Sequence, residues 1–164
     1  LEGGAKSGGE PPWGGELNLE VSHLGGHRFA PNVLDLSGGR NWVRLGPDEV
    51  GAIVHRDRPV SELRKFYRGW VGLDTPYEQV AERELLMLKG WDWMDCLISS
   101  KLVNMSNDSQ KALVKIDFTE SDGVDGSYEV TVENDGSVVM AECLNGEDAG
   151  ETTQYAVRQF VKVS

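Results

Sequence analysis

The chain has 164 residues, enough for one domain, and 39% of them are hydrophobic, which suffices for a buried core. Its formal net charge of -11 excludes the basic footprint of a nucleic-acid-binding protein, and an acidic surface favours encounters with basic partners. The two cysteines, Cys96 and Cys143, form neither a zinc motif nor a disulfide framework. Two isolated thiols favour a reducing compartment, so we expect a cytoplasmic protein, and the lack of a long apolar run predicts no membrane helix.

The first predicted elements are an arm and three strands. Residues 1–15 are rich in glycine and proline, which predicts a flexible arm. Apolar and polar residues alternate over 17–21, which predicts a half-buried strand. Two further strands are predicted over 32–36 and 40–45, and the Ser-Gly-Gly turn at 37–39 joins them as a hairpin.

Two helices are predicted after the hairpin. A proline followed by two acids at 47–49 is typical of a helix start, since acids favour the positive end of the helix dipole. His55 is expected at the end of this helix. Ser61 is expected to cap a second, short helix that ends at Phe66, and Tyr67–Gly69 closes this part of the chain.

The sequence pattern changes at residue 74, which divides the folded chain into a first part, 16–73, and a second part, 74–164. Thr75 and Pro76 predict the start of a helix whose apolar stripe, mixed with charges, is typical of a surface helix. Gly90 is expected to end this helix, and a further turn or helix is predicted from Trp91 to about Leu102.

The last third of the chain has the pattern of an antiparallel β region. Strands are predicted over 113–118 and 128–132. Asn134-Asp135-Gly136 predicts a hairpin turn into a strand at 138–140, and a final strand is predicted over 155–161.

The strongest candidate site is the stretch that holds His23 and His27. The histidines lie four residues apart, and Gly25 and Gly26 allow the backbone to curl so that both imidazoles converge. Neutral imidazoles are good ligands for zinc, copper or iron. The alternative is a glycine-rich turn whose histidines bond to backbone and water.

The other candidate site residues are interpreted as structural or solvent-exposed. Arg28, Arg40 and Arg44 form either a basic rim around a site or a solvated hairpin face, and the second interpretation is favoured. Cys96 follows acidic and aromatic residues that would raise the pKa of its thiol, so we expect a structural role. Cys143 is expected to pack at a strand end. No hydrolase, nucleotide-binding or dinucleotide-binding motif is present.

The stretch Ser22–Asn32, SHLGGHRFAPN, resembles the signature of the sucrase/ferredoxin-like family, the thioredoxin-like ferredoxins. The strand Trp42–Leu45, the tripeptide Tyr67–Gly69 and the helix Gln79–Glu84 are also similar to that family. The resemblance implies an α/β fold. Residues 16–73 would form the C-terminal half of a thioredoxin-like domain, followed by a helical and antiparallel β-hairpin region.

The resemblance also implies a cofactor. In that family the two histidines ligate one iron of a [2Fe–2S] cluster, and two preceding cysteines hold the other iron. Carried over, His23 and His27 would be ligands, and Gly25, Gly26 and Arg28 would line the cluster. Replacing thiolate by imidazole raises the reduction potential to roughly -150 to +300 mV. No cysteine precedes His23 here, so an upstream or partner segment is expected to supply both thiolates.

The resemblance therefore predicts an electron carrier rather than a catalyst, with a reductase and electron-acceptor proteins as partners. Two alternatives remain open. The chain could be a cluster-free binding or structural module with an idle or zinc-binding histidine pair. It could also be a thiol-dependent redox enzyme, although the chain has no CxxC motif.

Overall fold

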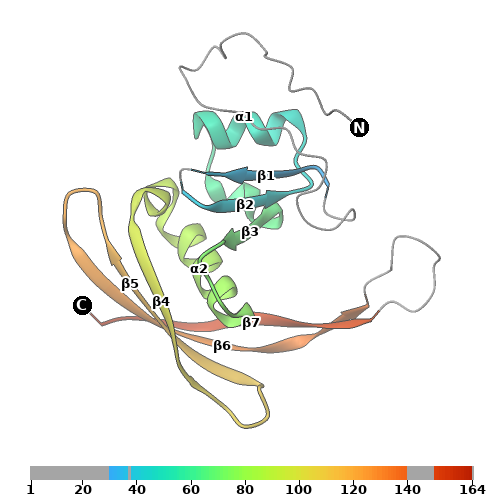
Figure 1. Ribbon diagram of the computed structural model, residues 1–164, viewed down its shortest axis with the longest axis vertical. Helices are drawn as coiled ribbons and strands as arrows, with labels where there is room; N and C mark the ends of the chain where they lie inside the picture. Colours follow the sequence, from blue (N-terminus) through green and yellow to red (C-terminus); the bar gives the residue numbers. More distant parts are fainter. Residues whose placement is uncertain (1–29, 37, 140–149, 164) are drawn as a thin grey trace, which may run out of the picture.

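The computed structural model describes residues 30–36, 38–139 and 150–163 (Figure 1). Over these residues the fold is mixed α/β, as expected. It contains a three-stranded and a four-stranded antiparallel sheet, two α-helices and two short 3₁₀ helices. The expected arm at 1–15 and strand at 17–21 lie outside the described residues.

The first sheet has the strand order β1-β2-β3. Its strands are β1 (Asn32–Asp35), β2 (Arg40–Val43) and β3 (Tyr67–Trp70). The predicted hairpin is confirmed, because Val33 pairs with Trp42 in antiparallel register. The third strand was missed: Tyr67–Gly69 continues the sheet instead of closing this part of the chain.

Two helical segments connect β2 to β3. Helix α1 (Pro47–His55) begins with the predicted proline and ends at His55, so both expectations are confirmed. The short segment η2 (Val60–Phe66) is a 3₁₀ helix. Its N-cap is Pro59 rather than Ser61, because the helix begins one residue before that serine and no side chain caps it.

Helix α2 (Pro76–Lys89) has the predicted ends. The Thr75 hydroxyl accepts a hydrogen bond from the Glu78 backbone N–H, and the Glu78 carboxylate accepts one from the Thr75 N–H. This reciprocal pair is a capping box, which satisfies two otherwise free donors of the first turn. The helix stops at Gly90, whose φ of 80° is readily adopted only by glycine.

The helix predicted to run to about Leu102 is wrong beyond its first turn. The 3₁₀ helix η3 (Trp91–Asp95) ends at Asp95, and strand β4 (Leu97–Met105) follows. Along its first half, β4 alternates between exposed residues and half-buried ones such as Ile98 and Leu102. This period of two is that of a strand with one face on the core.

The second sheet is a meander with the strand order β4-β5-β6-β7. Its other strands are β5 (Lys111–Thr119), β6 (Asp125–Val139) and β7 (Glu151–Lys162), which confirm the β character of this region. The predicted hairpin turn at Asn134-Asp135-Gly136 is wrong. Strand β6 runs through it with a register shift, because Asn134 and Ser137 both pair with β7. The extra residues form a bulge.

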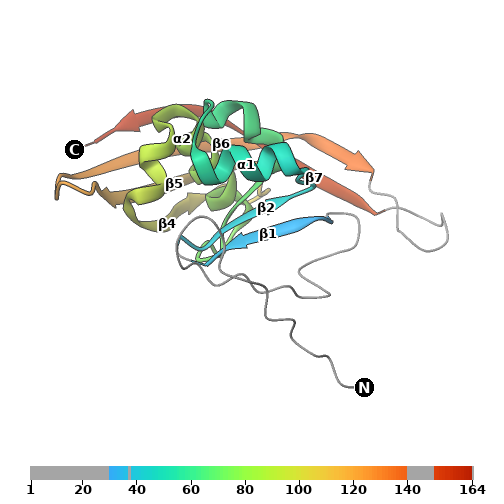
Figure 2. The same ribbon diagram turned by 90° about the horizontal axis from the view of Figure 1, so that it is seen from above.

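Helix α2 lies against the concave face of the second sheet and also contacts β3, so it lies between the two sheets (Figures 1 and 2). It is therefore not the predicted surface helix. Its buried residues recur with the helical period and include two acids; they are Tyr77, Glu78, Ala81, Glu82, Leu85 and Leu86. The helix is covered from both sides because each sheet must bury one apolar face.

One hydrophobic cluster joins residues of both predicted parts. It includes Trp42 and Leu63 of the first part and Leu85, Ile116 and Val130 of the second. The division at residue 74 stays a prediction about sequence organisation. No helix in the described part of the chain is long and apolar enough to cross a membrane.

Candidate functional site

The predicted metal and cofactor residues lie outside the described residues. These are His23, Gly25, Gly26, His27 and Arg28. The structure does describe the end of the motif, Ala30-Pro31-Asn32, which leads directly into β1. The Pro31 carbonyl accepts a hydrogen bond from the Leu45 N–H, so the end of the motif is attached to the residues that follow β2.

The described residues do not supply the cysteine ligands that the predicted cluster needs. Within them, no group of three or more His, Cys, Asp and Glu side chains could hold a metal ion. Cys96 is half-buried just before β4, and its thiol contacts the Asp92 carbonyl at 3.5 Å. Burial and the nearby Glu120 raise the pKa of this thiol, in the predicted direction. Cys143 lies outside the described residues.

A buried charged cluster joins the first sheet to α2. Glu82 of α2 is fully buried, and its carboxylate oxygens lie 2.9 and 3.0 Å from the Tyr67 hydroxyl of β3. The Trp93 indole N–H donates to the same carboxylate at 3.3 Å. The Nε of Arg40, on β2, lies 3.7 Å from it. We call Arg40, Tyr67, Glu82 and Trp93 the buried cluster.

Arg40 corrects the prediction of a solvated hairpin face. Only 2% of this residue is exposed, whereas Arg44 is exposed and Arg28 lies outside the described residues. One guanidinium nitrogen donates to the Gly38 carbonyl at 3.2 Å, and Nε makes no hydrogen bond. Arg40 therefore faces inward because Glu82 supplies the opposite charge that a buried guanidinium requires.

The surroundings of Glu82 determine its protonation. Burial raises the pKa of its carboxyl, and the Arg40 guanidinium and the hydrogen bond from Tyr67 oppose that shift. Burial and the Glu82 charge also raise the pKa of Tyr67, so its hydroxyl keeps the hydrogen that it donates. Burial therefore favours the protonated form of Glu82, while the Arg40 charge and the donated hydrogen bonds favour its charged form.

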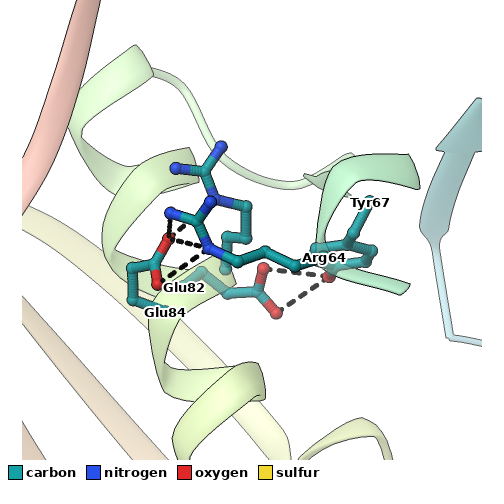
Figure 3. Close-up of polar contacts among 5 residues, drawn as sticks. Arg64, Tyr67, Glu82 and Glu84 are labelled. Atoms are coloured by element: carbon teal, nitrogen blue, oxygen red, sulfur yellow. Dashed lines mark hydrogen bonds and ion pairs between the residues drawn. The ribbon is translucent and has the colours of Figure 1, made fainter. Parts of the chain in front are cut away.

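A second carboxyl group, that of Glu84, lies near this cluster and behaves differently. Figure 3 shows Glu82 facing Tyr67, whereas Glu84 meets Arg64. Burial opposes ionisation of Glu84, but hydrogen bonds from Arg64 and Arg83 prevail and lower the pKa of its carboxyl. Glu84 therefore stays charged, whereas burial shifts the pKa of Glu82 in the opposite direction.

A cleft adjoins the buried cluster. Its volume is about 560 Å³, and it lies between the tip of the β1–β2 hairpin and the start of β4. Its lining combines apolar and charged side chains, among them Arg40, Trp70, Met94, Asp95, Cys96 and Ile98. At its rim, Arg56 donates two hydrogen bonds to Asp95, at 2.7 and 2.9 Å. The cleft therefore brings residues of both sheets to one surface.

No protein-family model matches this chain, and no curated protein or solved structure is significantly similar to it. The site must therefore be interpreted from its own geometry.

The sequence interpretation missed Glu82 and treated Arg40 as solvated. A signal for Glu82 was present, because it lies four residues after Glu78 and three before Leu85, on the stripe that carries the apolar residues. An acid on the apolar stripe of a helix needs a buried partner. The sequence offered no means to choose which of its arginines that partner was.

Proposed function

We propose that this chain is an electron-transfer protein of the thioredoxin-like ferredoxin type. The motif SHLGGHRFAPN carries this proposal. His23 and His27 would hold one iron of a [2Fe–2S] cluster, and Gly25, Gly26 and Arg28 would line it. The element order after the motif supports the proposal. The β1–β2 hairpin followed by α1 is the order expected for the second half of a thioredoxin-like domain.

The cysteine ligands of such a cluster must come from elsewhere. No described residue group offers a complete metal site, and the raised pKa of Cys96 disfavours its thiolate, the form that binds iron. In this proposal, an upstream or partner segment supplies two thiolates. A reductase and an electron acceptor are the partners, and the cluster supplies one-electron chemistry when bound.

A cluster-free binding module is the second candidate function. The cleft between the β1–β2 hairpin and β4 favours it, because apolar and charged side chains meet there on an accessible surface. The thiol-dependent enzyme has weaker support, since a raised thiol pKa reduces the reactive thiolate.

Optical spectroscopy tests the electron-transfer proposal. The purified chain is reconstituted with iron and sulfide, alone and with a cysteine-bearing segment, and its visible absorption, iron and sulfide are measured. We expect charge-transfer bands that are lost in His23→Ala and His27→Ala. His55→Ala is the matched control, because His55 ends helix α1 outside the motif.

Two results would contradict the proposal. One is a protein that stays colourless and free of iron under every reconstitution condition. The other is a chromophore that both histidine variants retain. Either result would leave the binding module as the better account.

A further inference from the structure

Strand β4 is an edge strand of the second sheet. Among the described residues it pairs only with β5, and besides β5 only α2 makes more than marginal contact with it. Its register with β5 is regular from Leu97 to Leu102, and the shift that follows lies at Val103. An edge strand with unpaired backbone groups is a template for another strand.

The side chains of β4 alternate between the two faces of the sheet. The half-buried residues lie on the face that packs against α2; they are Ile98, Ser100 and Leu102. The exposed residues lie on the opposite, convex face; they are Leu97, Ser99, Lys101 and Val103. Two of the exposed side chains are apolar, since Leu97 is 77% exposed and Val103 is 48% exposed. Each face of the strand therefore carries one apolar side chain on either side of its middle.

This pattern is self-complementary in one antiparallel register. When a second copy of β4 pairs about a two-fold axis at Ser100, Ile98 lies opposite the partner's Leu102, and Leu97 lies opposite the partner's Val103. Residues that are directly opposite in an antiparallel pair share a face of the sheet, and apolar pairs of this kind stabilise it. A two-fold contact uses the same patch on both copies, so each favourable pair occurs twice.

The charge of β4 favours the same register. Lys101 is the only charged residue of the strand, and with the axis at Ser100 it lies opposite the partner's Ser99. An axis at Lys101 would instead place two lysines directly opposite each other, which is destabilising. In the same row of the sheet, β5 places Asp117 beside Ser99, so the partner's Lys101 extends towards a carboxylate. Asp117 already meets Lys115 at 2.8 Å, so the apolar pairs contribute more than this attraction.

The cleft beside β4 leaves room for an added strand. Ile98 lines this 560 Å³ cleft together with Trp70 and Met94. The partner's Leu102, which lies opposite Ile98 in this register, would enter the cleft and cover these apolar side chains. The contact would therefore bury apolar surface that a single copy leaves open to solvent.

We propose that two copies of this chain associate through β4, in antiparallel register about Ser100, so that their four-stranded sheets become continuous. Main-chain hydrogen bonds along the edge provide affinity, and the paired apolar side chains set the register. This proposal does not depend on the iron–sulfur cluster.

Analytical ultracentrifugation of the full chain tests the proposal through substitutions at Ser99. Ser99 is exposed and lies opposite the partner's Lys101 in this register, so Ser99→Glu adds two attractive pairs to the dimer and Ser99→Lys adds two repulsive pairs. The matched controls are Thr153→Glu and Thr153→Lys, because Thr153 is exposed on β7, the other edge of the same sheet. Each protein is measured from about 1 μM to about 1 mM.

We expect a monomer–dimer equilibrium whose Kd falls about 2- to 30-fold in Ser99→Glu and rises by a similar factor in Ser99→Lys. Both Thr153 variants should leave the Kd unchanged. This ranking is specific to the register, because nonspecific association of a chain with net charge -11 would be weakened by an added acid and strengthened by an added lysine.

Several results would overturn the proposal. A chain that stays monomeric up to about 1 mM would show that the β4 edge is not an interface between copies. The reverse ranking of the two Ser99 variants would indicate association governed by net charge. A response to the Thr153 variants alone would place the interface on β7. Assemblies that grow beyond a dimer would indicate head-to-tail pairing of β4 with β7.

Discussion

The Tyr67 hydroxyl lies 2.9 and 3.0 Å from the two carboxylate oxygens of Glu82 and thereby joins β3 to α2. Both residues are buried, and Arg40 and Trp93 complete the set of polar partners around the carboxylate. Because α2 also fills the concave face of the second sheet, this contact helps to set the position of the first sheet relative to the second. The buried cluster is thus a polar part of a largely apolar core.

Removing Arg40 alone should be strongly destabilising. In Arg40→Leu, Glu82 loses the opposite charge beside its buried carboxylate, and we expect the free energy of unfolding to fall by about 3–5 kcal/mol. The double variant Arg40→Leu with Glu82→Leu removes both charges and should recover most of that loss. Urea denaturation of Arg40→Leu, Glu82→Leu and the double variant measures these free energies. A double variant as unstable as the sum of the two single changes would show that the two charges do not act as a pair.

Removing the Tyr67 hydroxyl should have a smaller effect. Tyr67→Phe keeps the ring packed against Trp42, whose ring centre lies 4.6 Å away, but takes one donor from Glu82. We expect a loss of about 1–3 kcal/mol in unfolding free energy, because the acceptor left behind is buried. Tyr77→Phe is the control, since the Tyr77 hydroxyl donates to the partly buried Ser109 carbonyl. An equal loss in both variants would mean that burial of the acceptor has no special effect.

The raised pKa of Glu82 predicts a pH dependence of stability. The ordinary pKa of a glutamate is 4.5, and burial raises that of Glu82 in the folded protein. Between the two values the folded state binds more protons than the unfolded state, so the unfolding free energy due to Glu82 falls as pH rises. This contribution is complete below pH 4.5 and is lost as pH passes through the folded pKa.

Glu82→Gln tests this pH dependence, because glutamine keeps the shape of the side chain and does not titrate. Unfolding free energies of both proteins are measured from acid to neutral pH. We expect the stability of the wild type relative to the variant to decrease with rising pH above 4.5. A difference that increases instead would mean that Arg40 and the hydrogen bonds lower the pKa of Glu82.

Local signals predicted much of the fold. The hairpin of β1 and β2, the proline that begins α1 and the capping box at Thr75 each depend on residues close in sequence, and the structure confirms them. The ends of these elements are set by local backbone preferences and by nearby side chains. The ends of these elements can therefore be predicted without the rest of the fold.

The predictions that proved wrong concern residues whose structure depends on partners far away in the sequence. Residues 97–102 are a strand because β5 pairs with them, and Asn134–Gly136 is a bulge because β7 continues along β6 on both sides of it. Arg40 was expected in solvent because its buried partner lies 42 positions further along the chain, at Glu82. Such partners are chosen by tertiary packing, which overrides local preference.

Two glycine substitutions should change stability in opposite directions. A Cβ at Gly126 on β6 would overlap the ring of Phe118. That ring packs against Trp93 and Tyr128 and has little room to move. We therefore expect Gly126→Ala to lower the unfolding free energy by about 1–3 kcal/mol through overpacking.

Gly51, inside α1, has no atom within 4 Å of such a Cβ. Gly51→Ala should therefore raise stability by about 0.5–1 kcal/mol, because alanine is the better helix former. Thermal unfolding of both variants checks the two signs, and a stabilising Gly126→Ala would contradict the close packing of Phe118 against β6.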